Sequence, residues 1–312
     1  TGGQFYVAKN PTYGAVFTYH LKDVPKTSKS KRIQSERKLN SDKKDVPFPG
    51  YKALSDEMNE KPASIILTIK DSNGNLINNV KKNASNGSGR IAWNLRHKSY
   101  YPIRSGSFRG GWGWSPSGPY ATPGDYQAEL FLENNGSIEK LDGPINFSVK
   151  PLREGTLKGA SYDEYNRFRE RVSELYINIS KYEDVFSMIG NKIQLLEKAS
   201  MQLESFSPDI IAKISDFKDR YNDYEYENDS SPARDEIGEW YKPNLGARIR
   251  IAMQGLSTSY GPTELNSSNL EIAEKHFEKM KNEIEQLNKE VKDLENEVKQ
   301  LNPPYIIGQG ID

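Results

Sequence analysis

The amino-acid sequence predicts an α+β protein of two domains, in which a β-sandwich precedes an antiparallel bundle of long heptad helices. Short runs rich in β-branched and aromatic residues alternate with turn residues in the first half of the chain. The hydrophobic period then changes from two to a repeat of three and four residues. The 312 residues also exceed the size at which single cores usually stop growing, about 250–300 residues. We therefore expect domains at residues 1–152 and 153–312.

The first domain is expected to contain about seven short strands, the number found in an immunoglobulin- or fibronectin-III-like sandwich. Asn73 and Gly74 predict the turn of a hairpin, because both residues tolerate positive φ angles. Trp93 lies in a strand of alternating apolar and polar residues and is the expected centre of the core. The strands are expected at residues 4–7, 15–21, 63–71, 76–80, 90–96, 125–133 and 145–149.

A basic insertion at about residues 22–52 interrupts these strands. It holds ten Lys or Arg and four Asp or Glu, whereas the whole chain has 43 of each charge and a net charge of zero. Because the insertion has few apolar residues, we interpret it as a solvated, mobile excursion, with binding of an anionic partner as the alternative. The zero net charge of the chain argues against a nucleic-acid-binding protein, which needs a basic surface to neutralise phosphates.

Two long helices are expected in the second domain. A capping-box pattern at Ser161 and Glu164 predicts the start of the first helix. Apolar residues then alternate three and four positions apart, which is the period of a helix that buries one face. The same spacing continues without interruption along the last helix. The two apolar stripes run from Phe168 to Leu196 and from Leu270 to Leu301.

The segments between the two stripes determine how the stripes are expected to pack. Pro208 predicts the start of a shorter helix, because proline is tolerated at the first helical position. An acidic, tyrosine-rich connection at residues 222–246 and a short helix at 248–256 follow. Stripes of similar length favour an antiparallel up-and-down bundle. An intermolecular coiled coil is the alternative.

No residue pattern in the sequence indicates catalysis. The chain has no cysteine, and His20, His97 and His276 lack partners at the spacing of metal ligands. No phosphate-binding loop, dinucleotide motif or nucleophile elbow is present. No stretch reaches the roughly 18 apolar residues that a membrane span requires. The sequence therefore predicts a protein that is not an enzyme, with no catalytic residue, no metal site, no cofactor and no membrane span.

A loop rich in glycine and aromatic residues, at 99–123, is the candidate binding surface. Aromatic side chains on a loop could stack on sugar rings or anchor a partner protein. Alternatively, they lie back over the end of the sandwich or pack against the helical bundle. The candidate residues are Tyr100, Tyr101, Phe108, Trp112, Trp114 and Tyr120.

Several short motifs resemble one protein family. In order, NPTYGAVFTYHLKD, PASIILTIKDSNGNLI, GRIAWNLR and GPYATPGDYQAEL are similar to the region after the β-propeller in sortilin-like (VPS10-like, BNR/Asp-box) proteins of Bacteroidota. Those proteins are often labelled glycosyl-hydrolase-like. The later GPTELN and LNPPYIIGQG resemble further segments of that family. The motifs are short and mainly structural, and Gly89, residues 93–96 and residues 123–126 match positions that define an Ig-like fold in the family.

The resemblance implies an extracytoplasmic accessory role and transfers no catalytic residue, because the propeller is not in this sequence. We expect a non-catalytic C-terminal module that docks its own β-propeller and binds cell-envelope proteins, for example in a secretion or gliding assembly. The chain would then be a C-terminal fragment of a periplasmic, cell-surface or secreted protein. The alternative is a carbohydrate-binding or glycoside-hydrolase-associated module that binds glycans through the loop aromatics.

Overall fold

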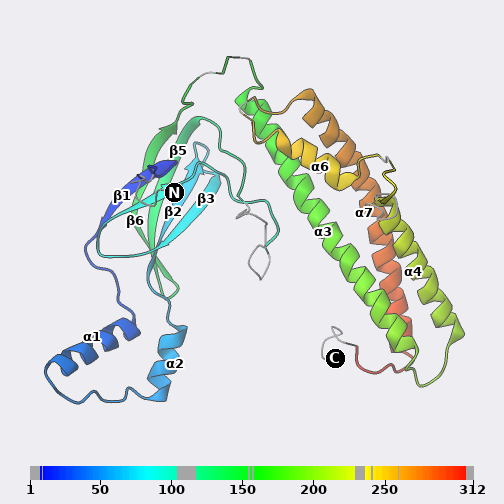
Figure 1. Ribbon diagram of the computed structural model, residues 1–312, viewed down its shortest axis with the longest axis horizontal. Coiled ribbons are helices and arrows are strands. Elements are labelled where there is room, and N and C mark those ends of the chain that lie inside the picture. The colour runs from blue at the N-terminus through cyan, green and yellow to red at the C-terminus, as the bar shows by residue number, and fades with distance from the viewer. Residues whose placement is uncertain are drawn as a thin grey trace, which may run out of the picture. The chain divides into compact units, whose positions relative to one another are not determined.

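The chain divides into two compact units in the computed structural model (Figure 1). The sheet unit comprises Thr1–Ser99 and Ser117–Glu154, and the helical unit comprises Tyr100–Pro116 and Gly155–Asp312. Each unit has its own hydrophobic core. The structure describes residues 8, 10–103, 117–153, 155–156, 158–228, 236–239, 242–258 and 260–306.

The expected fold class is wrong for the first half of the chain, because no Ig-like sandwich forms among the described residues. The strands form two small antiparallel sheets, one of two strands in the order β1-β4 and one of four strands in the order β3-β2-β5-β6. Residues 137–149 extend as one strand alongside β5, where the sequence predicted only a short final strand. The strands are β1 (Ala15–Leu21), β2 (Ser64–Asp71), β3 (Leu76–Asn83), β4 (Gly87–Trp93), β5 (Gly124–Asn134) and β6 (Ser137–Val149).

The two tight turns of the four-stranded sheet follow from local sequence. Asp71 accepts hydrogen bonds from the backbone N–H groups of Asn73 and Asn75, at 2.9 and 2.8 Å, which confirms the predicted β2–β3 hairpin. The β5–β6 hairpin turns through Asn135 and Gly136, whose φ angles are 49° and 83°. Two successive positive φ angles are typical of the two-residue turns that match the twist of paired strands.

The core of the sheet unit is centred on Trp93, which is fully buried. Its ring contacts those of Tyr126 and Phe147, with centroids 5.2 and 6.1 Å away. Strand β2 contributes the alternating residues that the sequence assigned to the core, and these are buried to 2% exposure or less. They are Ile65, Leu67 and Ile69.

The basic insertion, expected as an irregular excursion, instead contains two helices, α1 (Ser28–Ser41) and α2 (Tyr51–Asn59). The side chain of Thr27 accepts a hydrogen bond from the backbone N–H of Ser30 and so caps α1. Neither helix has a buried residue. Caps and polar contacts therefore hold these helices rather than an apolar core.

Four helices share the core of the helical unit. Ser161 and Glu164 form the capping box that the sequence predicted at the start of the first. Thr263 and Asn266 form a second box at the start of the last. The helices are α3 (Tyr162–Ser200), α4 (Pro208–Asn228), α6 (Leu245–Gln254) and α7 (Glu264–Lys299).

The expected antiparallel bundle is also wrong, because the two long helices α3 and α7 run parallel (Figure 1). A parallel pair keeps a constant sequence separation between contacting residues, whereas an antiparallel pair does not. The contacts between α3 and α7 keep a separation of 103 residues over most of their length. These contacts join Arg171 to Glu274, Tyr182 to Glu285, and Lys192 to Glu295.

Helices α4 and α6 together return the chain, so that α7 begins beside the start of α3. The hydroxyl of Tyr165 donates to the carbonyl of Leu256 at 3.1 Å, and the N–H of Ala160 donates to the carbonyl of Tyr260 at 2.8 Å. Helix α4 is antiparallel to α7. Its Lys213 and Arg220 bond Glu297 and Glu290, so the paired positions change in opposite directions.

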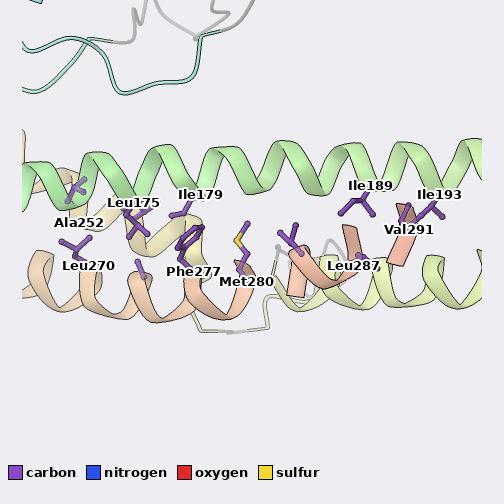
Figure 2. Packing of buried hydrophobic residues seen from close by; sticks show 14 of the residues in the cluster. Leu175, Ile179, Ile189, Ile193, Ala252, Leu270, Phe277, Met280, Leu287 and Val291 are labelled. Atoms are coloured by element: carbon purple, nitrogen blue, oxygen red, sulfur yellow. The ribbon is translucent and has the colours of Figure 1, made fainter. Parts of the chain in front are cut away.

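Apolar residues of α3 and α7 face one another along this parallel pair (Figure 2). Ile193 of α3 and Val291 of α7 belong to this core, and both are at least 97% buried. In the heptad repeat of α3, Arg171 and Lys192 occupy positions next to the apolar interface with α7. Residues at such positions form ion pairs with the facing helix when two helices run parallel. Heptad stripes thus predicted both helices correctly, but not their relative direction.

Candidate binding surface

Arg96 and Tyr120 lie close together and form the base of an exposed aromatic surface. The chain leaves the sheet unit shortly after Arg96, along the aromatic loop, and returns to it shortly before Tyr120. The two residues are joined by an antiparallel β-bridge. The guanidinium carbon of Arg96 lies 3.7 Å from the centroid of the Tyr120 ring, within the range of a cation–π contact. Its Nη1 donates to the carbonyl of Gly118 at 2.9 Å. A Cβ on Gly118 would lie 2.3 Å from the carbonyl oxygen of His97, so this close approach requires glycine.

The position of Arg96 depends on the buried core. The indole N–H of Trp93 donates to the carbonyl of Arg96 at 2.8 Å, and the side-chain amide of Asn78 donates to the same oxygen at 2.9 Å. Leu95, which lies between Trp93 and Arg96 in the sequence, has a φ of 59° that turns the chain out of strand β4. The residue that centres the core therefore also anchors the backbone of Arg96, whose side chain is half-buried.

Tyr13 is the third member of this surface. Strands β1 and β4 pair antiparallel, with Ala15 opposite Trp93. Residues just before β1 therefore lie near residues just after β4. The Tyr13 ring meets the Tyr120 ring edge-on, with 6.5 Å between centroids. Tyr13 is 62% exposed and Tyr120 is 39% exposed, and together with Arg96 they form what we call the Tyr13–Tyr120 surface.

Tyr100 and Tyr101 belong to the helical unit, and their rings are packed there. The two rings stack with 5.0 Å between centroids, and each meets Tyr176 of α3 edge-on, at 5.5 and 5.2 Å. Burial raises the pKa of the Tyr100 hydroxyl, since the ionised form would lose its hydration. Neither side chain is among the exposed ones, so these two aromatics serve packing on α3.

The six aromatic candidates thus do not form one cluster among the described residues. Tyr100 and Tyr101 lie in the helical unit and Tyr120 lies in the sheet unit. Phe108, Trp112 and Trp114 lie outside the described residues. Sequence reasoning missed the two partners of Tyr120, which are Tyr13 and Arg96. Only the pairing of β1 with β4, a contact between distant segments, would have revealed them.

The Tyr13–Tyr120 surface is built from residue types that are common at protein interfaces. Tyrosine and arginine are enriched among residues that dominate binding energies at protein interfaces. Arg96 forms no ion pair in the part of the chain that the structure describes, and its half-buried guanidinium instead contacts the Gly118 carbonyl and the Tyr120 ring. The β-bridge and the cation–π contact hold the side chains before binding, which lowers the entropy cost of association.

Two further properties of the described residues bear on function. They contain no group of three or more His, Asp or Glu side chains placed to hold a metal ion. None of their helices is long and apolar enough to cross a membrane. Comparison of the chain with protein-family models, curated proteins and solved structures finds no match.

Proposed function

We propose that this chain is a non-catalytic accessory module that binds partner proteins, and that it belongs to a sortilin-like β-propeller protein of the cell envelope. Its location is then extracytoplasmic, and its partners are its own propeller and other envelope proteins, as in a secretion or gliding assembly. The family assignment rests on the resemblance of GRIAWNLR, GPYATPGDYQAEL and the related motifs. The binding role rests on the Tyr13–Tyr120 surface.

The observation that carries the binding role is that two exposed tyrosines are ordered by folded strands. Tyr13 remains 62% exposed although it contacts Tyr120, and the backbone of Arg96 is anchored by the core residue Trp93. Stacking on a sugar ring needs an open aromatic face, and one face of Tyr120 is covered by the Arg96 guanidinium at 3.7 Å. Tyrosine with arginine is a combination enriched at protein interfaces, so a protein partner is the proposal and a glycan is the alternative.

The proposal is tested by co-purification from the native organism. The full-length gene product carrying Tyr13→Ala and Tyr120→Ala is compared with the unmutated protein, with envelope proteins identified by mass spectrometry. We expect specific partners of the unmutated protein to be reduced at least tenfold, about 1.4 kcal/mol or more, as for interface anchors. Ile138→Ala, a change at a 63% exposed residue of β6, is the matched control and should retain the partners.

A glycan-binding screen of the same proteins tests the carbohydrate alternative. Binding of a glycan by the unmutated chain, lost in the Tyr13→Ala/Tyr120→Ala variant, would replace the protein-binding proposal. Retention of every partner by the double variant would also contradict the proposal, provided that its circular dichroism spectrum is unchanged.

A further inference from the structure

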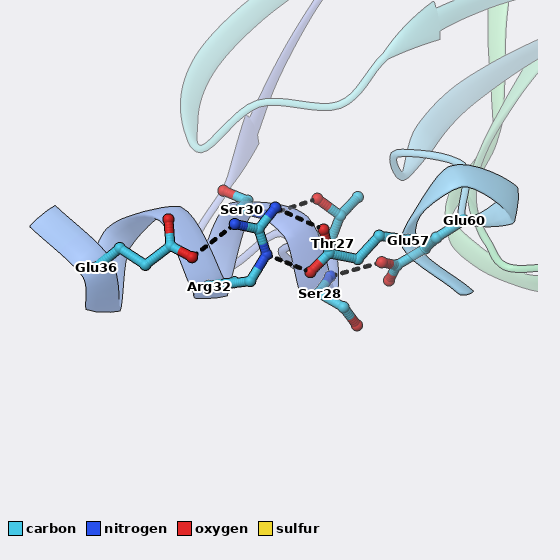
Figure 3. A network of polar contacts seen from close by, with 7 residues as sticks. All are labelled: Thr27, Ser28, Ser30, Arg32, Glu36, Glu57 and Glu60. Atoms are coloured by element: carbon cyan, nitrogen blue, oxygen red, sulfur yellow. Dashed lines mark hydrogen bonds and ion pairs between the residues drawn. The ribbon is translucent and has the colours of Figure 1, made fainter. Parts of the chain in front are cut away.

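The helices α1 and α2 form a basic helix pair, residues 22–61, whose role the proposed function leaves unexplained. Polar contacts hold the pair (Figure 3). The guanidinium of Arg32 bonds both carboxylate oxygens of Glu57 at 2.8 Å, and it bonds Glu36 at 2.6 Å. The backbone N–H of Ser28 donates to Glu60 at 2.6 Å. Two-point pairing of arginine with a carboxylate fixes both distance and orientation, so α2 is held at α1 through its Glu57 and Glu60 side.

The apolar face of α2 is left uncovered by this arrangement. Tyr51, Leu54 and Met58 share one face because they are three and seven positions apart. Tyr51 is 84% exposed and Met58 is 87% exposed. The ring of Phe48, itself 64% exposed, packs edge-on against Tyr51 with 5.1 Å between centroids. The apolar side chains therefore protrude as a small tip rather than line a groove.

The basic helix pair carries an excess of positive charge, most of it on and around α1. Residues 22–61 hold eleven Lys or Arg and seven Asp or Glu. Arg32 is neutralised by Glu36 and Glu57. The other cations of α1 form no ion pair with any described residue, and the helical period distributes them around the helix. They are Lys29, Lys31, Arg37 and Lys38.

We infer that the basic helix pair docks on an anionic lipid surface, with Phe48, Tyr51 and Met58 entering the headgroup region. A protruding tip suits a deformable lipid phase, whereas a folded protein partner would have to supply a pocket of matching shape. Attraction to an anionic leaflet is diffuse and needs no paired geometry, which suits cations distributed around α1. Aromatic side chains beside lysines are typical of segments that lie in the membrane interface.

This inference goes beyond the proposed function and uses no residue of the Tyr13–Tyr120 surface. The test is sedimentation of the full chain with phosphatidylcholine vesicles that contain either no phosphatidylglycerol or about 30% of it. We expect binding only to the anionic vesicles. Raising NaCl to about 0.5 M should weaken it, because added salt screens the charges.

Two double variants separate the contributions to vesicle binding. Lys31→Glu/Lys38→Glu should lower the partition coefficient by about thirtyfold or more, because each cation near the surface matters. Tyr51→Ser/Met58→Ser should lower it by about tenfold or more, since apolar burial is lost. The matched controls are Lys275→Glu/Lys292→Glu on α7 and Ile138→Ser/Leu152→Ser, which change exposed residues of the same types and should bind as the unmutated chain does.

Several results would overturn the inference. Vesicle binding that is absent, or equal in all variants, would do so. Retained binding by Tyr51→Ser/Met58→Ser would show electrostatic adsorption without apolar docking. Lysine-dependent binding to poly-glutamate, with none to anionic vesicles, would identify an acidic polypeptide as the occupant instead. All changed residues are exposed, so unchanged circular dichroism spectra are expected for every variant.

Discussion

The aromatic residues predicted as a binding surface have different surroundings in the sheet unit and in the helical unit. In the helical unit, Tyr100 and Tyr101 stack and pack against Tyr176 of α3. In the sheet unit, Tyr13 and Tyr120 contact each other but stay exposed. The helical unit buries apolar residues along two long parallel helices, whereas the sheet unit buries a small cluster around Trp93. Because Tyr13 and Tyr120 stay exposed while Tyr100 and Tyr101 are packed, we propose that recognition belongs to the sheet unit.

The largest expected effect concerns the relative direction of the two long helices α3 and α7. Spin labels on cysteines introduced at Glu170 of α3 and at Lys275 or Lys299 of α7 should report it, and the chain has no native cysteine to interfere. The two α7 positions lie about 36 Å apart at about 1.5 Å per residue. Parallel helices predict a separation of about 20 Å for 170/275 and about 40 Å for 170/299. An antiparallel pair would exchange the two distances.

The next largest effect is expected at the core of the sheet unit. Trp93→Ala should lower the free energy of unfolding by about 3–5 kcal/mol, because it leaves a cavity and removes the indole donor to Arg96. Chemical denaturation followed by circular dichroism measures the change. Val16→Ala on β1, a 44% exposed position, is the control and should change stability little. A stability unchanged by Trp93→Ala would mean that this residue is not the centre of the core.

A smaller effect is expected where α6 meets α7. Buried Asn266 accepts a hydrogen bond from the N–H of Thr263 at 2.9 Å and donates to the carbonyl of Ile251 at 2.7 Å. Asn266→Leu removes the side-chain half of the capping box and leaves the Ile251 carbonyl unpaired, so it should cost about 1–3 kcal/mol of unfolding free energy. Asn282→Leu, at an exposed position of the same helix, is the control. Equal stability of the two variants would contradict the role given to Asn266.

The smallest effect is a pH dependence in the sheet unit. Hydrogen bonds from Lys140 and Lys70 to Glu129 lower the pKa of its carboxyl below 4.5 in the folded state. The unfolded chain then binds the proton at higher pH, so this stabilisation is complete above about pH 4.5 and is lost as the pH falls through the folded pKa. Glu129→Gln should make the acid-induced fall in melting temperature shallower. Glu139→Gln, exposed on β6, should leave the fall unchanged.

Local patterns in the sequence predicted local structure well. The Asp71 turn and the Ser161–Glu164 capping box are confirmed because each depends on residues a few positions apart. The stripe from Leu270 onward is buried along α7, as its heptad spacing predicted. Each of these patterns involves residues of a single helix or turn, so the structure of that helix or turn can be predicted from one sequence.

Contacts between distant segments were not predictable in the same way. A heptad stripe shows which face of a helix is buried but carries no direction, so α3 and α7 were wrongly expected to be antiparallel. Helix α1 was missed because the Thr27 cap and Arg32 stabilise it rather than apolar residues. Of the proposed binding surface, Tyr120 was a candidate because of its aromatic loop. Tyr13 was not, because only the β1–β4 pairing brings it there.

Site-specific photo-crosslinking tests most directly whether recognition belongs to the sheet unit. A photoreactive phenylalanine is placed at Tyr120 or at Met188, a 59% exposed residue of α3, in the full-length protein in its own cells. We predict a discrete crosslinked partner from position 120, weakened by Tyr13→Ala, and none from position 188. A partner captured from position 188 but not from position 120 would contradict the account.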